Sequence, residues 1–380
     1  MVQRKGKGTE KSPHQVVIVG AGSAGVGMAV TLQHAGVKDV VLLERHGVGA
    51  SFSRWPAEMR LITPSFPTNS IGMLDLNSIA IGTSPGFSLK IEHPSGKEYA
   101  TYLQAVAQHF QLRVRSEVNV SEIVPREDSF EVQTNEGELY ARYVIWAAGE
   151  FQYPLLRSFP GAELCKHAAL VSSWKKYTTA DDVLIIGGYE SGIDAAIHLA
   201  RSGKKVMVLD RGAPWHSEDS DPSVSLSPFT LERLKEPEVA SRVKLASHAE
   251  VAEVKRWGQG YEVRTTNGKA FRSACSPVLA TGFQGSMSLI RDLFETREDG
   301  YPLLNDQDES TITPNLFLSG PMVRHDEHVF CFIYKFRQRF AVIAKAIANR
   351  LQLPAEELET YRQWGMYLDD LSCCGEECVC

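Results

Sequence analysis

The chain of 380 residues is 43% hydrophobic and 23% charged, as in an ordinary globular protein, and it is long enough for two or three domains with full cores. A net charge of −6 with no clustered basic patch argues against a nucleic-acid surface, and no apolar stretch has the length of a membrane span. The basic residues of segment 1–12 precede no apolar run long enough for a signal peptide, so we expect a disordered arm on a cytoplasmic protein.

The first predicted element is a buried parallel strand, Val16–Val19, that runs into Gly20-x-Gly22-x-x-Gly25. The first glycine permits a tight turn, the second lets a pyrophosphate approach the backbone, and the third lets the following helix pack on the strand. A later strand ends on Glu44, where a carboxylate can accept hydrogen bonds from a ribose hydroxyl. The segment therefore predicts a dinucleotide site, formed by Gly20, Gly22, Ser23, Ala24, Gly25, Glu44 and Arg45.

The same pattern recurs after a predicted strand at residues 183–186, and a later strand ends at Asp210. Tyr189 stands where the middle glycine is expected, which narrows the approach to a phosphate. Asp210 favours the free 2′-hydroxyl of NADH, whereas Arg211 would meet the 2′-phosphate of NADPH, and both alternatives stay open. A doubly wound domain that has lost its ligand is the other interpretation. The intact helix start and terminal acid favour a second dinucleotide site, formed by Gly187, Gly188, Tyr189, Glu190, Ser191, Gly192, Asp210 and Arg211.

Two further segments are predicted from their composition. Residues 216–229, HSEDSDPSVSLSPF, are polar and contain proline, which indicates a loop and a candidate lid. Residues 328–351 are predicted to be helical, with one apolar stripe that we expect to pack in the core. The members of this stripe are Phe332, Phe336, Phe340 and Ile343.

Three short apolar strands each end in a small residue and glycine, in YVIWAAGEF, PVLATGF and PNLFLSGP. With the two glycine-rich turns they make the chain, from about Val16 to Leu351, resemble the two-dinucleotide-binding flavoproteins: thioredoxin reductases, bacillithiol-disulfide-reductase-like proteins and flavin-containing monooxygenases. The resemblance implies an α/β fold with two Rossmann-like, doubly wound domains, of which the first binds FAD and the second, inserted one binds NAD(P)H. It also implies that the residues at the ends of these three strands belong to the cofactor sites. They are Ala148, Gly149, Thr281, Gly282, Gly320 and Pro321.

The resemblance also implies a domain order and a homodimer. One departure concerns the last FAD motif, which in the family ends in glycine-aspartate but here reads Gly320-Pro321. We expect Asp326 to supply the missing carboxylate, or the contact to be absent. The implied order is an arm at 1–12, the first part of the FAD domain at 13–155, the NAD(P) domain at 156–279, the second part of the FAD domain at 280–351, and an extension with a cysteine-rich tail at 352–380.

By the same resemblance, two segments lie beside the flavin ring. The first is rich in aromatic residues, prolines and arginines, and its candidates for cofactor or substrate contact are Ser51, Phe52, Trp55, Arg60 and Thr63. An irregular packed loop is the alternative for this segment. In the second, GPMVRHDEHVFCF, His325 and His328 are candidate proton donors and Cys331 a candidate thiol, whereas caps or surface histidines are the alternative. The spacing of the two histidines is too common to predict a metal site.

The cysteines and histidines should separate disulfide chemistry from oxygen chemistry. The C-x4-C and C-x-x-C pairs of disulfide reductases are both missing, and Cys165 and Cys275 stand alone as expected inert thiols. The monooxygenase fingerprint is only partly present in FPGAELCKHAALVSSWKKY. Val171 stands where its histidine is usual, and we expect the displaced His167 to be a surface residue without a role.

The last eight residues, CCGEECVC, contain four cysteines that we predict as catalytic candidates: Cys373, Cys374, Cys378 and Cys380. In large thioredoxin reductases and mercuric reductases a flexible C-terminal thiol pair serves the flavin-side site, and the placement here is similar. Glu376 and Glu377 disfavour a resting thiolate by like-charge repulsion, which affects soft-metal capture less. A redox relay, metal handling and a tail without function all stay open.

The leading prediction is an FAD-dependent NAD(P)H oxidoreductase that passes hydride from the nicotinamide to the flavin and on to a thiol, disulfide or metal-type acceptor. One alternative is a flavin monooxygenase that uses NAD(P)H and oxygen. The other is a non-catalytic flavoprotein sensor or metal-binding partner, which Tyr189 would favour if it blocked the nicotinamide. Expected partners are a small-molecule or thiol/disulfide substrate and a second copy of the chain, without nucleic acid or membrane.

Overall fold

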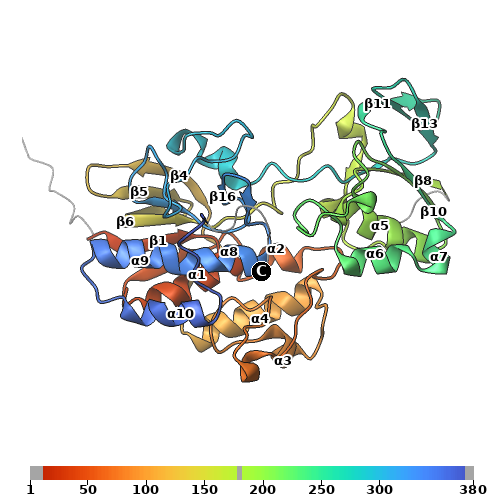
Figure 1. Cartoon of the computed structure of the whole chain (residues 1–380). Coiled ribbons are helices and arrows are strands. Elements are labelled where there is room, and N and C mark those ends of the chain that lie inside the picture. Colours follow the sequence, from red (N-terminus) through yellow and green to blue (C-terminus); the bar gives the residue numbers. More distant parts are fainter. Residues whose placement is uncertain (1–11, 178–181, 373–380) are drawn as a thin grey trace, which may run out of the picture.

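A computed structural model describes residues 12–177 and 182–372, so nearly all of the predicted arm and all four tail cysteines lie outside the described residues. The chain forms two α/β halves that meet at the centre of Figure 1. No helix in the described ranges is long and apolar enough to cross a bilayer.

The first half is built on a seven-stranded sheet with the order β3-β2-β1-β6-β5-β4, in which β15 also pairs with β6. β1 is parallel to β2 and β6, and β15 returns parallel to β6 after the whole second half has intervened in the sequence. The strands are β1 (His14–Val19), β2 (Val40–Leu43), β3 (Val114–Arg115), β4 (Val120–Pro125), β5 (Phe130–Thr134), β6 (Gly137–Trp146) and β15 (Leu316–Leu318).

Helices cover this sheet, and α1 and α9 pack against each other. The α-helices of the first half are α1 (Ser23–His34), α2 (Ala50–Ser53), α3 (Pro85–Leu89), α4 (Gly96–His109), α8 (Ile333–Phe336), α9 (Phe340–Arg350) and α10 (Thr360–Gln363). The 3-10 turns used below are η1 (Asn69–Ile71) and η7 (Arg337–Arg339). A two-stranded hairpin of β16 (Arg324–His325) and β17 (His328–Val329) follows β15.

The second half contains a five-stranded parallel sheet with the order β10-β9-β8-β14-β7 and a three-stranded antiparallel sheet. Its strands are β7 (Lys166–His167), β8 (Asp182–Ile186), β9 (Lys205–Leu209), β10 (Val243–Ala246), β11 (Val251–Trp257), β12 (Gly260–Thr265), β13 (Ala270–Ser273) and β14 (Val278–Leu279). Its α-helices are α5 (Glu190–Arg201), α6 (Pro228–Leu234) and α7 (Pro237–Ala240). The predicted fold class, with one doubly wound domain inserted into another, is therefore confirmed.

The loop predicted from polar composition is confirmed, whereas the helix predicted for residues 328–351 is shorter than expected. Residues 217–227 are irregular, as the polar composition indicates. The helix predicted for residues 328–351 begins only at Ile333 and is interrupted by η7, because β17 and an extended stretch occupy its first five positions. Phe336 and Phe340 are buried as predicted, whereas Phe332 is only half-buried.

Candidate functional site

A cavity of about 350 Å³ lies between the two halves, at the carboxyl ends of β1 and β6 and beside the first turn of α5. Ligands of doubly wound sheets bind at this edge, where helix N-termini present free N–H groups. Residues of both glycine-rich turns face the cavity: Gly20 and Gly22 from the first, and Glu190 and Ser191 from the second. The first turn and the start of α5, which follows the glycines of the second turn, therefore border one space.

The first turn is shaped by close backbone approaches. Gly20 has a φ of +106°, and a Cβ there would lie 2.4 Å from the carbonyl oxygen of Ala147. A Cβ on Gly22 would meet nothing within 4 Å, so the backbone at the start of α1 faces open space. The buried carboxylate of Glu44 accepts hydrogen bonds from the backbone N–H of Ala21 (2.8 Å) and of His46 (2.9 Å), which fixes the acid beside the turn.

Most of the cofactor residues predicted in the first half line this cavity. They are Gly20, Gly22, Ser23, Ala24, Glu44, Ser51, Phe52, Trp55, Arg60, Thr63, Ala148, Gly149 and Pro321, joined from the second half by Glu190 and Ser191. Cys331 is the one candidate from the catalytic set that lines the cavity among the residues that the structure describes.

Other candidates lie outside the lining. Gly25 and Gly192 have packing positions behind their turns, because a Cβ on either would collide with the first glycine of its own turn. The cofactor candidates outside the lining are Gly25, Arg45, Gly187, Gly188, Tyr189, Gly192, Asp210, Arg211, Thr281, Gly282 and Gly320, and the histidine candidates outside it are His325 and His328.

The second turn repeats the first with different surroundings. The Asp210 carboxylate accepts hydrogen bonds from the backbone N–H groups of Gly188 (2.7 Å) and Gly212 (2.7 Å), as Glu44 does in the first turn. The Tyr189 side chain leaves the turn, and its hydroxyl donates to carbonyl oxygens of the 217–227 loop. Trp215 packs on the turn, since a Cβ at Gly188 would lie 2.5 Å from its ring.

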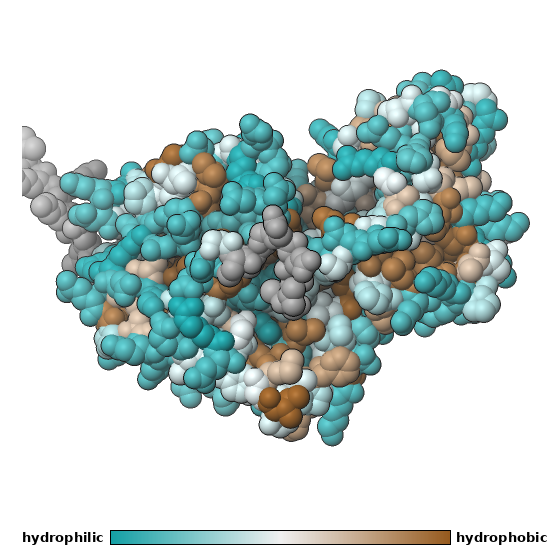
Figure 2. All heavy atoms as spheres, viewed as in Figure 1, coloured by the Kyte–Doolittle hydropathy of each residue, from teal (hydrophilic) through white to brown (hydrophobic). Residues whose placement is uncertain are grey.

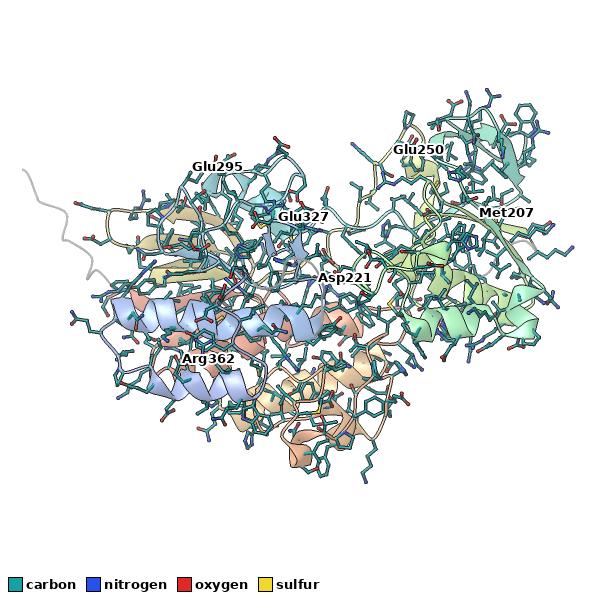
Figure 3. All side chains as sticks on the ribbon, in the orientation of Figure 1. Met207, Asp221, Glu250, Glu295, Glu327 and Arg362 are labelled. Carbon is teal, nitrogen blue, oxygen red and sulfur yellow. The ribbon has the colours of Figure 1, made fainter. Side chains whose placement is uncertain are left out.

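The 217–227 loop also holds the two halves together. Lys335 Nζ of α8 lies 2.6 Å from Asp221 Oδ1 and 2.9 Å from Ser223 Oγ. The Cys331 thiol donates to the same Ser223 oxygen at 3.2 Å. Figure 3 labels Asp221 at this junction. The loop predicted as a candidate lid therefore contacts Cys331 and joins the second half to α8, whose residues line the cavity.

Three titratable groups that line the cavity, Glu150, Glu190 and Cys331, have a pKa that burial raises. Burial raises the pKa of the Glu150 carboxyl, and the nearby charge of Arg324 opposes this only in part. Burial likewise raises the pKa of the Cys331 thiol, against the hydrogen bond with Ser223. Burial in the cavity therefore favours the neutral form of each of these groups.

Three expectations about polar residues were wrong or displaced. His167 is 2% exposed, not a surface residue, because Nε2 bonds the carbonyl oxygen of Gly282 at 3.0 Å and Nδ1 accepts from the backbone of Ala169. Asp326 lies exposed in the β16–β17 turn and is not among the residues that line the cavity. His325 turns away to the buried Asp308, with Nε2 2.5 Å from Oδ1.

The two other cysteines that the structure describes, Cys165 and Cys275, do not line the cavity. Burial raises the pKa of Cys165 to about 12, which makes it an inert thiol, and Cys275 is half-buried outside the cavity. The ranges 12–177 and 182–372 contain no group of three His, Cys, Asp or Glu side chains placed to hold a metal ion.

Sequence reasoning missed part of the lining. Glu150, Phe151 and Gln152 directly follow the crossover Gly149, so their position after a strand-end glycine could have identified them. Asp194 lies one helical turn after Glu190 on α5, and this spacing was also available. The other missed residues come together only through tertiary contacts: Met59, Leu61, Ile62, Asn77, Ala147, Phe283, Phe332, Ile333 and Phe336.

Substitution of Glu150 by glutamine is expected to change how stability depends on pH. The folded-state pKa of this carboxyl is raised above its ordinary 4.5. The protonated carboxyl therefore contributes fully to the free energy of unfolding below pH 4.5, and this contribution is lost as pH rises through the raised pKa. Glu150→Gln should therefore gain thermal stability relative to wild type as pH rises above 4.5. Melting curves of the cofactor-free proteins across pH measure this difference, and an equal difference at every pH would contradict the assignment.

The sequence pattern of a family described as pyridine nucleotide-disulphide oxidoreductase matches residues 17–320. The chain is 24% identical over 347 residues to the bacilliredoxin reductase Bdr of Bacillus subtilis, covering 88% of this chain and 98% of the relative. It resembles the structure of the bacillithiol disulfide reductase Bdr from Staphylococcus aureus with a TM-score of 0.74 and 22% identity, over 90% of this chain and 99% of that one. A flavin-containing monooxygenase from Stenotrophomonas maltophilia has a TM-score of 0.68 and 16% identity, over 90% and 100% of the two chains.

Proposed function

The chain belongs to the pyridine nucleotide-disulphide oxidoreductase family and is an oxidoreductase, and on this premise we propose that it is an FAD-dependent NAD(P)H oxidoreductase with a thiol, disulfide or metal-type acceptor. The cavity that the first glycine-rich turn and the start of α5 line together is the observation that carries the proposal. We also propose that the protein acts as a homodimer. The similarity to a protein named bacilliredoxin reductase supports a thiol or disulfide as the acceptor.

The residues of the first turn fit a dinucleotide such as FAD. The open space at Gly22 would admit a pyrophosphate against the start of α1, where free backbone N–H groups are available. The buried Ser319 Oγ, directly before Gly320, has no hydrogen-bond partner within the described residues, as expected of a group that bonds a ligand. When bound, the flavin would supply hydride and electron transfer between the nicotinamide and the acceptor.

The second turn fits a nicotinamide dinucleotide that binds and leaves in each reaction cycle, provided that the Trp215 ring can accommodate it. Gly187 and Asp210 have the geometry of their counterparts in the first turn, and Tyr189 does not fill the turn because its side chain bonds the lid loop. Trp215 lies against Gly188, so a dinucleotide would stack on this ring or displace it. Glu190 and Ser191, which face the cavity, would then orient the reacting end of the nucleotide toward the flavin site.

Two residues of the cavity lining, Glu150 and Cys331, would serve the acceptor. Glu150, whose carboxyl pKa is raised by burial, would supply a proton to a leaving thiolate. Cys331 stands alone in the described lining, so disulfide exchange through an internal dithiol would need a second thiol from outside it. The tail cysteines, led by Cys373, are the proposed source, either as a redox relay or in metal handling.

A flavin monooxygenase is the second candidate. It is favoured by the presence of one cysteine, not a pair, among the described residues that line the cavity. The partly present fingerprint weakens it, because buried Val171 occupies the usual histidine position.

The proposal is tested by anaerobic stopped-flow reduction of the yellow protein with NADH and with NADPH. We expect one nucleotide to bleach the flavin of the full-length chain and of a chain truncated after Leu371. Only the full-length chain should then show two additional electrons stored as titratable thiols, because the truncation removes four cysteines.

The outcomes separate the alternatives. Equal bleaching with no new thiols in either chain would refute the tail relay and leave oxygen or an external acceptor. Oxygen uptake coupled to substrate hydroxylation would favour the monooxygenase. Absence of bleaching by both nucleotides would refute the NAD(P)H-dependent reaction itself.

A further inference from the structure

The 217–227 loop contacts both the second glycine-rich turn and a residue of the cavity wall. At the turn, the Tyr189 hydroxyl donates to the carbonyl oxygens of Pro222 and of Ser225 (2.9 Å). At the cavity, the Cys331 thiol donates to Ser223 Oγ at 3.2 Å. Because Pro222 and Ser223 are consecutive, a movement of the loop at the turn also changes its contact with the thiol. Figure 2 shows the surface indented between the two halves that this loop joins.

An ion pair between the two halves holds the loop in this position. Lys335 Nζ lies 2.6 Å from Asp221 Oδ1 and donates to Ser223 Oγ at 2.9 Å. The two charged side chains are 15% and 29% exposed, so solvent and salt screen their attraction less than that of a surface pair. Asp221 Oδ1 also accepts from the backbone N–H of Ser223 at 2.8 Å. The ion pair therefore fixes the oxygen atom that bonds the Cys331 thiol.

The ring that packs on the second turn belongs to the same segment of chain. Trp215 lies in η4 (Pro214–His216), directly before the loop. A Cβ on Gly188 would lie 2.5 Å from the Trp215 ring and 2.9 Å from Asp210 Cβ, so the ring lies beside the carboxylate that a ribose would contact. A dinucleotide that reaches Asp210 would therefore displace Trp215, and with it the start of the loop.

Cys331 lies where a molecule bound in the cavity would meet it. Asp194 lines the same cavity and is 5% exposed, and its Oδ2 atom has no hydrogen-bond partner among the described residues. A buried polar atom of this kind is expected to bond a ligand. Burial is the largest cause of the raised pKa of the Cys331 thiol, so departure of the loop would favour the reactive thiolate as well as open access to the sulfur.

We propose that the 217–227 loop holds the Cys331 thiol and releases it when a dinucleotide binds at the second turn, an inference that rests on the proposed nucleotide site. In the held arrangement, Lys335 and Cys331 bond the loop while Trp215 packs on Gly188. In the released arrangement, the nucleotide takes the place of the Trp215 ring and the loop leaves Lys335 and Cys331. The thiol then becomes available to the acceptor only when the nucleotide that supplies the electrons is bound.

The two arrangements make the coupling reciprocal. A ligand that binds only the released arrangement shifts the population toward it. When the released fraction is small, the rate at which the thiol reacts and the affinity for the nucleotide are both proportional to that fraction. A substitution that weakens the pair of Asp221 and Lys335 should therefore change both quantities by the same factor.

The experiment measures alkylation of Cys331 by iodoacetamide in the full chain with its flavin bound. The ligands are ADP and 2′,5′-ADP, which carry the adenosine part of NADH and of NADPH but no nicotinamide, so they neither fill the cavity nor reduce the flavin. Cleavage after lysine and arginine releases residues 325–335, in which Cys331 is the only cysteine, so mass spectrometry follows this thiol alone. The nucleotide that binds should raise the alkylation rate about tenfold or more at saturation.

Asp221→Asn and Lys335→Met are the test variants, and asparagine keeps an acceptor for the Ser223 N–H. Each should raise the alkylation rate without nucleotide about fivefold and tighten nucleotide binding, measured by calorimetry, by the same factor. The double variant should exceed either single variant by less than about twofold, because both remove one interaction. Glu359→Gln, which breaks the pair with Lys345 outside the loop, is the control and should change neither quantity.

Hydrogen–deuterium exchange supplies a measurement that needs no variant. Backbone amides of residues 217–227 should exchange faster when ADP or 2′,5′-ADP is bound, while those of α7 stay unchanged. Slower exchange of the loop, a nucleotide that binds without raising the alkylation rate, or test variants that alkylate at the wild-type rate would overturn the inference. If these results occur while NADH or NADPH still bleaches the flavin, the proposed reaction stands and only the loop inference fails. Absence of calorimetric binding by both ligands in wild type and in Asp221→Asn would refute the nucleotide site and the inference together.

Discussion

Gly25→Ala is expected to destabilise the first half by roughly 3 kcal/mol or more and to abolish flavin retention. A Cβ at this position would lie 2.0 Å from the carbonyl oxygen of Gly20, a backbone atom that cannot yield without separating α1 from β1. Since the same turn forms the cavity edge, any such shift misplaces the backbone N–H groups at Gly22. Urea unfolding and the ratio of flavin to protein absorbance measure the two effects.

Two matched glycine variants separate folding from binding. Gly22→Ala meets no atom within 4 Å and keeps an ordinary φ of −81°, so it should fold with wild-type stability while losing flavin affinity. Gly192→Ala repeats the Gly25 collision in the second half, 1.9 Å from the Gly187 oxygen, and should retain flavin but lose reduction by nicotinamide. Wild-type stability of Gly25→Ala, or flavin loss from Gly192→Ala, would contradict this division of the two halves.

Arg339→Met is expected to lower the free energy of unfolding by about 3–5 kcal/mol, because it leaves the Asp308 carboxylate buried without its main cation. Arg339 is 1% exposed and Asp308 is fully buried, and Arg339 Nη2 donates to Asp308 Oδ1 at 2.8 Å. The same guanidinium donates to the carbonyl oxygens of Asp306 (2.6 Å) and Leu368 (2.5 Å). It therefore joins η7 to the segment of residues 306–308 and to the segment around Leu368. Denaturant unfolding at neutral pH measures the loss.

The control for this prediction is an exposed arginine. Arg362, labelled in Figure 3, pairs with Asp369 at 2.7 Å, but both side chains are 42% exposed, so Arg362→Met should cost less than about 1 kcal/mol. Adding Asp308→Asn to Arg339→Met should recover part of the loss, because the stranded charge is removed. Equal effects of the buried and exposed variants would show that burial of Asp308 does not set the energy.

Local constraints made much of the first site predictable from sequence. Gly20 and Gly25 are required by contacts within one turn and its own helix, so their spacing carries the information. Glu44 is found because it ends the strand next to that turn, where its carboxylate meets the Ala21 N–H. The cavity residues that follow Gly149 were missed, although their position was equally regular.

Errors arose where a partner comes from far along the chain. His167 is buried because the carbonyl oxygen of Gly282, more than a hundred residues away in the sequence, accepts its hydrogen bond. No local sequence pattern indicates that partner. His325 likewise faces Asp308 rather than the cavity. The start of the helix at Ile333 was displaced because the preceding residues form a hairpin instead.

The sequence by itself determined the family, the two doubly wound halves and the glycines of both turns, since these depend on backbone geometry within a few residues. Only the tertiary structure decided that the first turn and the start of α5 border one cavity, and that the 217–227 loop ties Cys331 and Lys335 to the second half. It also decided that large hydrophobic residues of segment 61–89 face outward. These features depend on burial and on contacts between distant segments, and an amino-acid pattern specifies neither until the chain has folded.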